Sequence, residues 1–170
     1  MALHLGTSRP TRFHRAAWIL LSCAALSLPL LHGADSVQFP ENFRRWVHVG
    51  TGVILPGTNP ALKSEEGMHH VFANPKAVEG YSTGDFADGS IIVYELREAK
   101  QMKGVIFEGD RRRVDVMIKD STLYKDTGGW RFERFWANDQ AQNAIQDAGA
   151  SCFACHSNAK MHGFVFSQLH

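Results

Sequence analysis

The residues best equipped for chemistry are Cys152, Cys155 and His156, which stand near the C-terminus in the pattern Cys-x-x-Cys-His. Two thiols at this spacing can each add to a vinyl group of haem, and the histidine that follows is then held as an axial ligand of the iron. On one turn of helix the three side chains share a face. The pattern therefore predicts one covalently attached haem c per chain, with His156 as its metal ligand.

Three other uses of this pattern are less well supported. A structural zinc site needs a second pair of Cys or His ligands at suitable spacing, and the only other cysteine is Cys23, in the leader described below. A thioredoxin-like dithiol follows a strand within a βαβ unit and does not need the histidine. A simple disulfide leaves His156 without a role. Haem attachment accounts for all three residues.

The first 34 residues have the organisation of a secretory signal peptide. Three arginines precede an apolar run from Ala16 to Leu31, and small residues follow it. The run is short and contains Pro29, which argues against the alternative of an uncleaved membrane anchor. We predict a signal peptide over residues 1–34, a haem domain over residues 35–170 and a periplasmic location. Export agrees with haem attachment, which bacteria perform outside the cytoplasmic membrane.

Composition indicates one globular domain and excludes a nucleic-acid partner. The chain has 170 residues, of which 44% are hydrophobic, enough for one core. Of 18 basic residues, three lie in the leader, so 15 remain against 17 acidic ones. This balance provides no basic surface for nucleic acid. Because haem would use both remaining cysteines, no structural disulfide is expected.

The rest of the chain predicts an α+β fold, predominantly an antiparallel β-sheet with short helices and a C-terminal haem attachment segment. In the first strand, Gly50 and Gly52 indicate a bulge or a close backbone approach. A hairpin is expected around Gly109 and Asp110. Strands are predicted over 46–55, 68–73, 90–98, 104–108, 113–119 and 130–136, helices over 75–82 and 137–148, a helical turn at the haem motif, and a loop over 56–67.

Several segments, taken in order, resemble the cytochrome P460 family and its relatives, the cytochromes c′-beta. They are FPENFRRWVHVGTG from Phe39, VFANP from Val71, TGDFADGSIIVYEL from Thr83, IKDS from Ile118, GWRF from Gly129, and CFACH from Cys152 followed by FVFS from Phe164. The resemblance implies an antiparallel β fold, a homodimer, and a five-coordinate c-type haem whose proximal ligand matches His156. Members with a lysine–haem cross-link oxidise hydroxylamine, and members without it bind NO or CO.

The sequence departs from the family at the positions that decide reactivity. Tyr94 stands where the cross-linking lysine would be, and a phenol cannot form the same link. We expect Tyr94 to contact the haem edge from a strand, although a tyrosine–haem bond is chemically conceivable. His69 stands where some members carry a basic distal residue. Asp115 matches the pocket carboxylate, and it is either a proton acceptor or a charge on the polar side of a strand.

Three functions follow as hypotheses. The first is an exported haem protein whose open distal site binds NO or related small nitrogen ligands. The second is an oxidoreductase that oxidises hydroxylamine, with Asp115, His69 and Tyr94 as its catalytic candidates and a periplasmic electron-transfer partner. The third is an electron-transfer cytochrome with a methionine as sixth ligand. Further candidates are His70 as a base near the ligand, Phe72, Phe86 and Phe107 as apolar caps, and Met68, Met102 and Met161 as sixth ligands.

Overall fold

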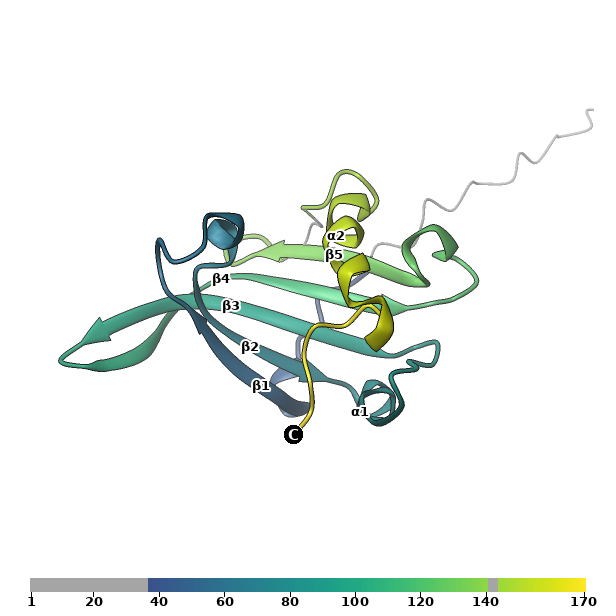
Figure 1. Cartoon of the computed structure of the whole chain (residues 1–170), viewed down its shortest axis with the longest axis horizontal. Coiled ribbons are helices and arrows are strands. Elements are labelled where there is room, and N and C mark those ends of the chain that lie inside the picture. Colours follow the sequence, from purple (N-terminus) through teal and green to yellow (C-terminus); the bar gives the residue numbers. More distant parts are fainter. Residues whose placement is uncertain (1–36, 141–143) are drawn as a thin grey trace, which may run out of the picture. The chain divides into compact units, whose positions relative to one another are not determined.

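A five-stranded antiparallel sheet forms the centre of the fold (Figure 1). The structure is a computed structural model that describes residues 37–140 and 144–170, so the predicted leader lies outside the described residues. The strands are β1 (Val47–Ile54), β2 (Gly67–Ala73), β3 (Ile91–Met102), β4 (Val105–Lys119) and β5 (Trp130–Trp136). The helices are α1 (Pro75–Thr83), α2 (Ala150–His156), and the short 3-10 helices η1 (Phe43–Arg45), η2 (Pro60–Glu65), η3 (Lys125–Thr127) and η4 (Ser157–His162). The predicted α+β class with a dominant antiparallel sheet is confirmed.

Each strand pairs with the strand that follows it in sequence, which defines two faces of the sheet. Val71 pairs with Tyr94, Tyr94 with Asp115, and Asp115 with Arg134, so these four residues form one row across four strands. Because side chains alternate along a strand, their neighbours in sequence point to the opposite side. We call the face that carries this row the front face and the other the back face.

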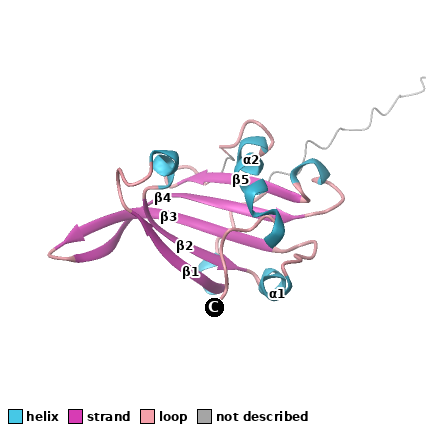
Figure 2. Ribbon diagram, viewed as in Figure 1, coloured by secondary structure: helices cyan, strands magenta, loops and turns pink. Residues whose placement is uncertain are grey.

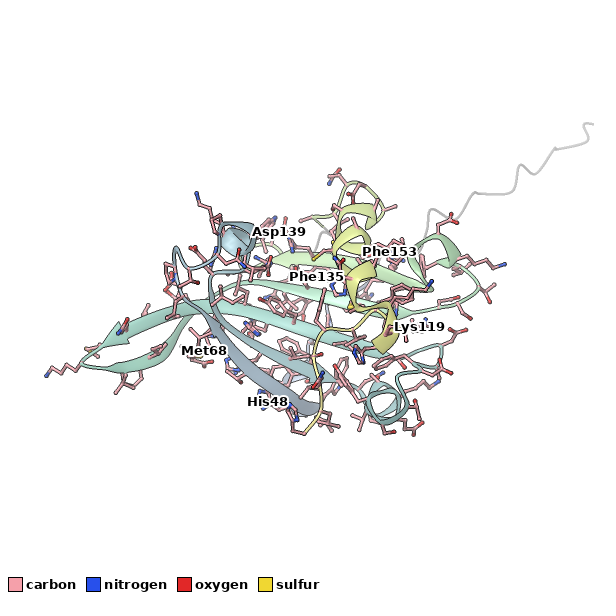
Figure 3. The ribbon with its side chains drawn as sticks, in the orientation of Figure 1. His48, Met68, Lys119, Phe135, Asp139 and Phe153 are labelled. Carbon is pink, nitrogen blue, oxygen red and sulfur yellow. The ribbon has the colours of Figure 1, made fainter. Side chains whose placement is uncertain are left out.

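The two faces pack against different ends of the chain. On the front face, a core that includes Ile92, Met117 and Phe132 packs against Cys152, Phe153 and Phe164 of the C-terminal segment. Figure 3 shows Phe153 on α2. On the back face, a second core is covered by the N-terminal segment, and its members are Phe43, Phe72, Val93, Val114, Val116 and Phe135 with Val37, Phe39 and Trp46 packed against it. The front face is therefore the one that receives the haem motif.

The short helix α1 begins at Pro75, as the sequence predicts, and ends at Thr83, one residue later than predicted. Asn74 accepts a hydrogen bond on its side-chain oxygen from the Ala77 amide at 2.9 Å, and Pro75 occupies the first turn, where no amide hydrogen is needed. Gly84 caps the end of the helix, and its φ of 74° lies in the left-handed region that glycine adopts without cost. The connection between β2 and β3 is fixed by these local signals.

The predicted hairpin around Gly109 and Asp110 is wrong. β4 runs without interruption from Val105 to Lys119 and pairs with β3, as Figure 2 shows. The turn lies instead at Lys103 and Gly104, which both have positive φ, at 51° and 82°. Two consecutive residues with positive φ suit the twist of a two-residue hairpin turn. The register between β3 and β4 shifts near Arg97, and the two strands stay paired on both sides of Gly109 and Asp110.

The predicted helix over residues 137–148 is not formed by the described residues of that segment, 137–140 and 144–148, which make turns and bends. Their backbone donors bond to the sheet instead: the Ala137 amide donates to the Arg112 carbonyl at 3.1 Å and the Ala144 amide to the Arg134 carbonyl at 2.7 Å. Asp139 also bridges to Trp136. Helical propensity is overridden here because carbonyls of β4 and β5 accept these bonds. The loop expected over residues 56–67 likewise contains η2.

All described residues belong to one compact unit, which spans Ala34–His170. Among these residues no helix is long and apolar enough to cross a membrane. The predicted signal peptide and its cleavage site fall outside the described residues and stay predictions.

Candidate haem site

The helix α2 presents both cysteines and the histidine of the motif, as the sequence predicts. Gly149 precedes it with a φ of 88°, and the Asp147 carboxylate accepts from the Gly149 amide at 3.1 Å and from the Ser151 amide at 2.9 Å. These bonds satisfy amide groups that the first turn leaves free, and the bonds from Ser151 and Gly149 hold the pKa of Asp147 below its usual value. Local capping thus starts the haem-binding helix.

The two thiols are free and lie at different depths. Cys155 is exposed, whereas Cys152 is half-buried beside the front core, and neither forms a disulfide. Burial raises the pKa of the Cys152 thiol. A hollow of about 310 Å³ opens beside Cys152, and it is lined by Arg134, Trp136, Ala144, Ile145, Gln146, Asp147, Ser151 and Cys152. Both sulfur atoms can therefore be approached from outside the core.

The imidazole of His156 is held in one orientation. Its Nδ1 donates to the carbonyl of Phe164 at 2.8 Å. The rings of Phe132 and Phe166 contact it with centroids 5.1 Å away in each case. A carbonyl can only accept, so Nδ1 carries the proton and Nε2 is left with a free lone pair. Burial lowers the pKa of His156, although the hydrogen bond to Phe164 acts in the opposite direction. The lowered pKa favours the neutral imidazole, which is the form that binds a metal.

The donor set fits a covalently attached haem. Haem needs two thiols for its vinyl groups and one imidazole for the iron, and α2 supplies all three within five consecutive residues. In the part of the chain that the structure describes, no group of three or more His, Cys, Asp or Glu side chains is arranged to hold a metal ion by itself. A zinc centre built from the motif would need such a group.

His69 and Tyr94 lie together on the front face, as the sequence-based assignment of distal residues requires. Their rings stack with centroids 5.0 Å apart and an interplanar angle of 20°. Burial lowers the pKa of His69, and burial together with the Glu65 carboxylate raises the pKa of Tyr94, so both side chains are uncharged at neutral pH. Nδ1 of His69 is buried and has no hydrogen-bond partner among the described residues. Such an atom is costly unless a ligand or water meets it.

The carboxylate of Asp115 is occupied by two arginines. Arg134 donates to both of its oxygens, from Nε at 2.6 Å and from Nη2 at 2.7 Å, and Arg113 donates from Nε at 3.0 Å. A paired arginine of this geometry stabilises the ionised carboxylate. The structure places Asp115 beside Tyr94, as expected for a pocket carboxylate, but a proton can be accepted there only if these bonds are weakened.

Sequence reasoning missed an acidic residue that interacts with Tyr94. Glu65, at the end of η2, forms an ion pair with Arg113, accepts from Ser64 at 3.0 Å and interacts with the Tyr94 hydroxyl. Nothing in the polar loop around Glu65 marks it as a site residue. Arg134 was missed for a different reason: only the register between β4 and β5 places it opposite Asp115.

The other candidate residues lie apart from His69, Tyr94 and Asp115. Met68, His70 and Phe72 alternate with the front-face residues of β2 and lie on the back face, where His70 bonds to Thr51 at 2.8 Å and Glu108 at 2.9 Å. Phe86 is buried in the front core against Trp130. Phe107 and Met102 are exposed on the part of the β3–β4 hairpin near its turn, and Met161 in η4 is 87% exposed.

Gly52 makes room for His69, which gives the first prediction. A Cβ atom at Gly52 would lie 2.6 Å from Cε1 and from Nε2 of the His69 ring. We expect Gly52→Ala to push the imidazole out of its stack on Tyr94 and to lower the free energy of unfolding by about 1–3 kcal/mol, as overpacking does. Denaturant unfolding measures the loss of stability, and the spectrum with CO reports the change at the ligand side.

Gly50→Ala is the matched control, because a Cβ atom at Gly50 meets nothing within 4 Å. It should change stability by no more than about 0.5 kcal/mol. Equal effects of the two substitutions would contradict the specific role of the space at Gly52. The expected bulge is also present here, since the β1–β2 register shifts between His48 and Gly50.

Fold and site together define a class: an antiparallel β protein whose C-terminal helix carries a haem c attachment motif. The family model for Cytochrome P460 matches residues 40–167, which include all five strands, α2 and η4. The chain belongs to the cytochrome P460 family, and membership implies a c-type haem as cofactor. No curated protein matches the chain in a direct comparison.

Proposed function

We propose that this protein is an exported c-type haem protein of the c′-beta kind, whose open distal site binds NO or a related small nitrogen ligand. The haem is attached through Cys152 and Cys155, and His156 is the proximal ligand. When bound, the haem iron supplies a coordination position that takes a diatomic ligand. The observation that carries the proposal is the uncharged pair His69 and Tyr94 on the face that receives α2.

This lining favours neutral ligands. A stacked imidazole and phenol without charge give no attraction to an anion, whereas the unpaired buried Nδ1 of His69 offers one polar contact to a small molecule. The arginines of the front face are already neutralised by Glu65 and Asp115, which keeps their charge from the ligand. Tyr94 in place of lysine supplies no amine for a cross-link.

The electron-transfer alternative has less support. It needs a sixth ligand, and the three methionines considered for that role lie on the back face, in the β3–β4 hairpin and on the exposed side of η4. Met68 therefore points away from the front face, and Met102 and Met161 point into solvent, with 59% and 87% of their surface exposed.

A second function, oxidation of hydroxylamine, is favoured by one observation. Two carboxylates, Glu65 and Asp115, lie beside Tyr94, and either can take up a proton from a bound nitrogen compound once its arginine bonds loosen. This activity would also need a periplasmic electron acceptor. Steady turnover of hydroxylamine with such an acceptor would establish it over ligand binding alone.

The proposal includes the setting of the protein. We infer cleavage of the leader near residue 34, a periplasmic location and a homodimer, since the haem motif requires attachment outside the cytoplasm and the resemblance implies a dimer. The intact mass of the secreted protein checks the cleavage site, and sedimentation checks the dimer.

The absorption spectrum of the ferrous protein, with and without CO or NO, tests the function. We expect a high-spin ferrous form that takes up both gases, and an intact mass equal to the polypeptide plus one haem. A low-spin ferrous form with sharp bands and no uptake of CO would contradict the proposal. A red-shifted Soret band of the P460 type with an altered mass would reveal a cross-link and favour the oxidoreductase.

A further inference from the structure

A bulky residue with strained backbone lies next to the proximal histidine. Phe164 has a φ of 68°, and it is one of only three non-glycine residues with positive φ in the described part of the chain. The other two, Lys103 and Ala148, each precede a glycine in a turn. For an aromatic residue this conformation is an outlier that persists only where surrounding contacts enforce it, and such outliers gather at functional sites.

Contacts on every side of Phe164 enforce its conformation. Its amide donates to the Ala159 carbonyl at 2.9 Å, and the preceding carbonyl, of Gly163, accepts from Nε1 of Trp130 at 2.8 Å. The Phe164 ring contacts Phe153 with centroids 5.4 Å apart. On its other side it fills the space of a missing side chain, since a Cβ atom at Gly128 would lie 2.6 Å from the ring.

The segment that follows Phe164 is anchored as well. Val165 is buried in the front core. The Ser167 hydroxyl lies 2.7 Å from the hydroxyl of Tyr81 in α1. The direction of the Phe164 carbonyl is therefore set by the sheet and by α1 as well as by the loop itself.

This carbonyl is the hydrogen-bond partner of His156. Proximal histidines in haem proteins depend on the partner of their second nitrogen for orientation and basicity. The two carboxylates on the same face, Glu65 and Asp115, are paired with arginines. The strength of the bond from His156 to iron then depends on how firmly a neutral carbonyl is held in place.

We propose that Phe164 is a positioning residue of the haem site: its left-handed backbone, locked between Gly128, Phe153 and Trp130, holds the carbonyl that orients His156 and thereby sets whether His156 stays on the iron when NO binds. This inference rests on the proposed function, because it concerns the haem and the response to NO. It differs from that function in naming what controls the proximal side.

Phe164→Ala tests the proposal in the haem-loaded protein. Alanine keeps the unfavourable φ but loses the ring that enforces it, so the segment should relax and the carbonyl should turn away from Nδ1. We expect the iron–histidine stretching band in the resonance Raman spectrum of the ferrous protein to move to lower frequency. With NO present, we expect the ratio of histidine-off to histidine-on forms, measured by EPR, to rise on the order of tenfold.

Phe164→Gly and Lys103→Gly are the matched variants. Phe164→Gly loses the same ring, but glycine adopts positive φ freely, so this variant should shift the band less than Phe164→Ala does. Lys103→Gly relieves similar strain in the β3–β4 turn, away from His156, and should leave the band unchanged. If Phe164→Ala leaves the band unchanged, or if Phe164→Gly shifts it as much as Phe164→Ala does, the role of the backbone conformation is wrong.

Trp130→Phe gives an independent test if Phe164→Ala fails to retain haem. It removes the donor to the Gly163 carbonyl and keeps Phe164 itself, and we expect a smaller shift of the band in the same direction. If the iron–histidine band does not move in Trp130→Phe, the sheet does not anchor the Phe164 carbonyl. Because the band is measured without NO, a protein that does not bind NO would refute the proposed function without deciding this inference.

Discussion

Replacing both cysteines of α2, as Cys152→Ser with Cys155→Ser, should remove covalently attached haem from the purified protein. A serine hydroxyl does not add to a vinyl group, so both thioether bonds are lost while the size of the side chains is nearly unchanged. The intact mass should fall to that of the polypeptide alone, and haem staining after denaturing electrophoresis should disappear. Each single substitution should retain one bond and therefore some stained protein.

Ser157→Ala is a suitable control for the double variant. Ser157 follows the motif directly, and its hydroxyl donates to the Ala154 carbonyl at 2.8 Å, so the substitution alters the same helical segment without touching either sulfur. It should keep the full haem content. Haem that remains attached to the double variant after denaturation would contradict the assignment and would identify another attachment point, of which Tyr94 is the first to examine by peptide mapping.

The second large effect is expected on the back face, at Glu95. Its side chain is fully buried, and it accepts from Arg44 at 2.6 Å, from Arg111 at 2.6 Å and from Arg97 at 3.1 Å. Glu95→Gln would remove the buried counter-charge of three arginines, of which Arg44 and Arg97 keep the carboxylate of Glu108 at 3.8 and 3.4 Å. Breaking a buried ion pair costs about 3–5 kcal/mol, and the partly exposed arginines place this case near 3 kcal/mol. Denaturant unfolding of the haem-loaded protein measures this loss.

Glu98→Gln provides the comparison within the same strand. Glu98 is half-exposed and pairs with Lys100 at the surface, so its substitution should change stability by less than about 0.5 kcal/mol. Similar losses of stability for Glu95→Gln and Glu98→Gln would show that the ion pairs of Glu95, including the one to Arg44 of η1, do not hold the N-terminal segment on the sheet.

Acid should reduce the difference between the parent and Glu95→Gln. Burial alone raises the pKa of Glu95, but the hydrogen bonds and charges of Arg111 and Arg44 outweigh it and bring the pKa below its ordinary value. A carboxyl whose folded-state pKa is depressed contributes stability above its unfolded pKa of about 4.3. That contribution is lost as the pH falls through the folded-state value, so unfolding measured at decreasing pH should bring the two proteins together.

Local chemistry decided the parts of the fold that the sequence predicted well. The start of α1 at Pro75 and the strand β5 depend on neighbours in the chain, and the structure has them as expected. The two wrong predictions concern segments that a partner strand controls. Gly109 and Asp110 stay extended because β4 pairs with β3 on both sides of them across a shifted register, and residues after β5 bond to carbonyls of β4 and β5.

The candidate site divides in the same way. Cys152, Cys155 and His156 are recognisable from sequence because one helical turn contains the attachment chemistry. Glu65, Arg113 and Arg134 could not be predicted, since their pairing with Tyr94 and Asp115 depends on strand register and on where η2 returns to the sheet.

By itself, the sequence predicted the haem cofactor, which family membership supports, and His156 as its proximal ligand, because these predictions follow from spacing within five consecutive residues. Only the tertiary structure decided what surrounds them: Asp115 is held by arginines, His69 stacks on Tyr94 in the space that Gly52 leaves, and the carbonyl of a left-handed Phe164 accepts a hydrogen bond from Nδ1 of His156. The physical reason is distance along the chain. The front face is assembled from five strands, η2 and the C-terminal segment, so the environment of the haem motif depends on contacts between residues far apart in sequence.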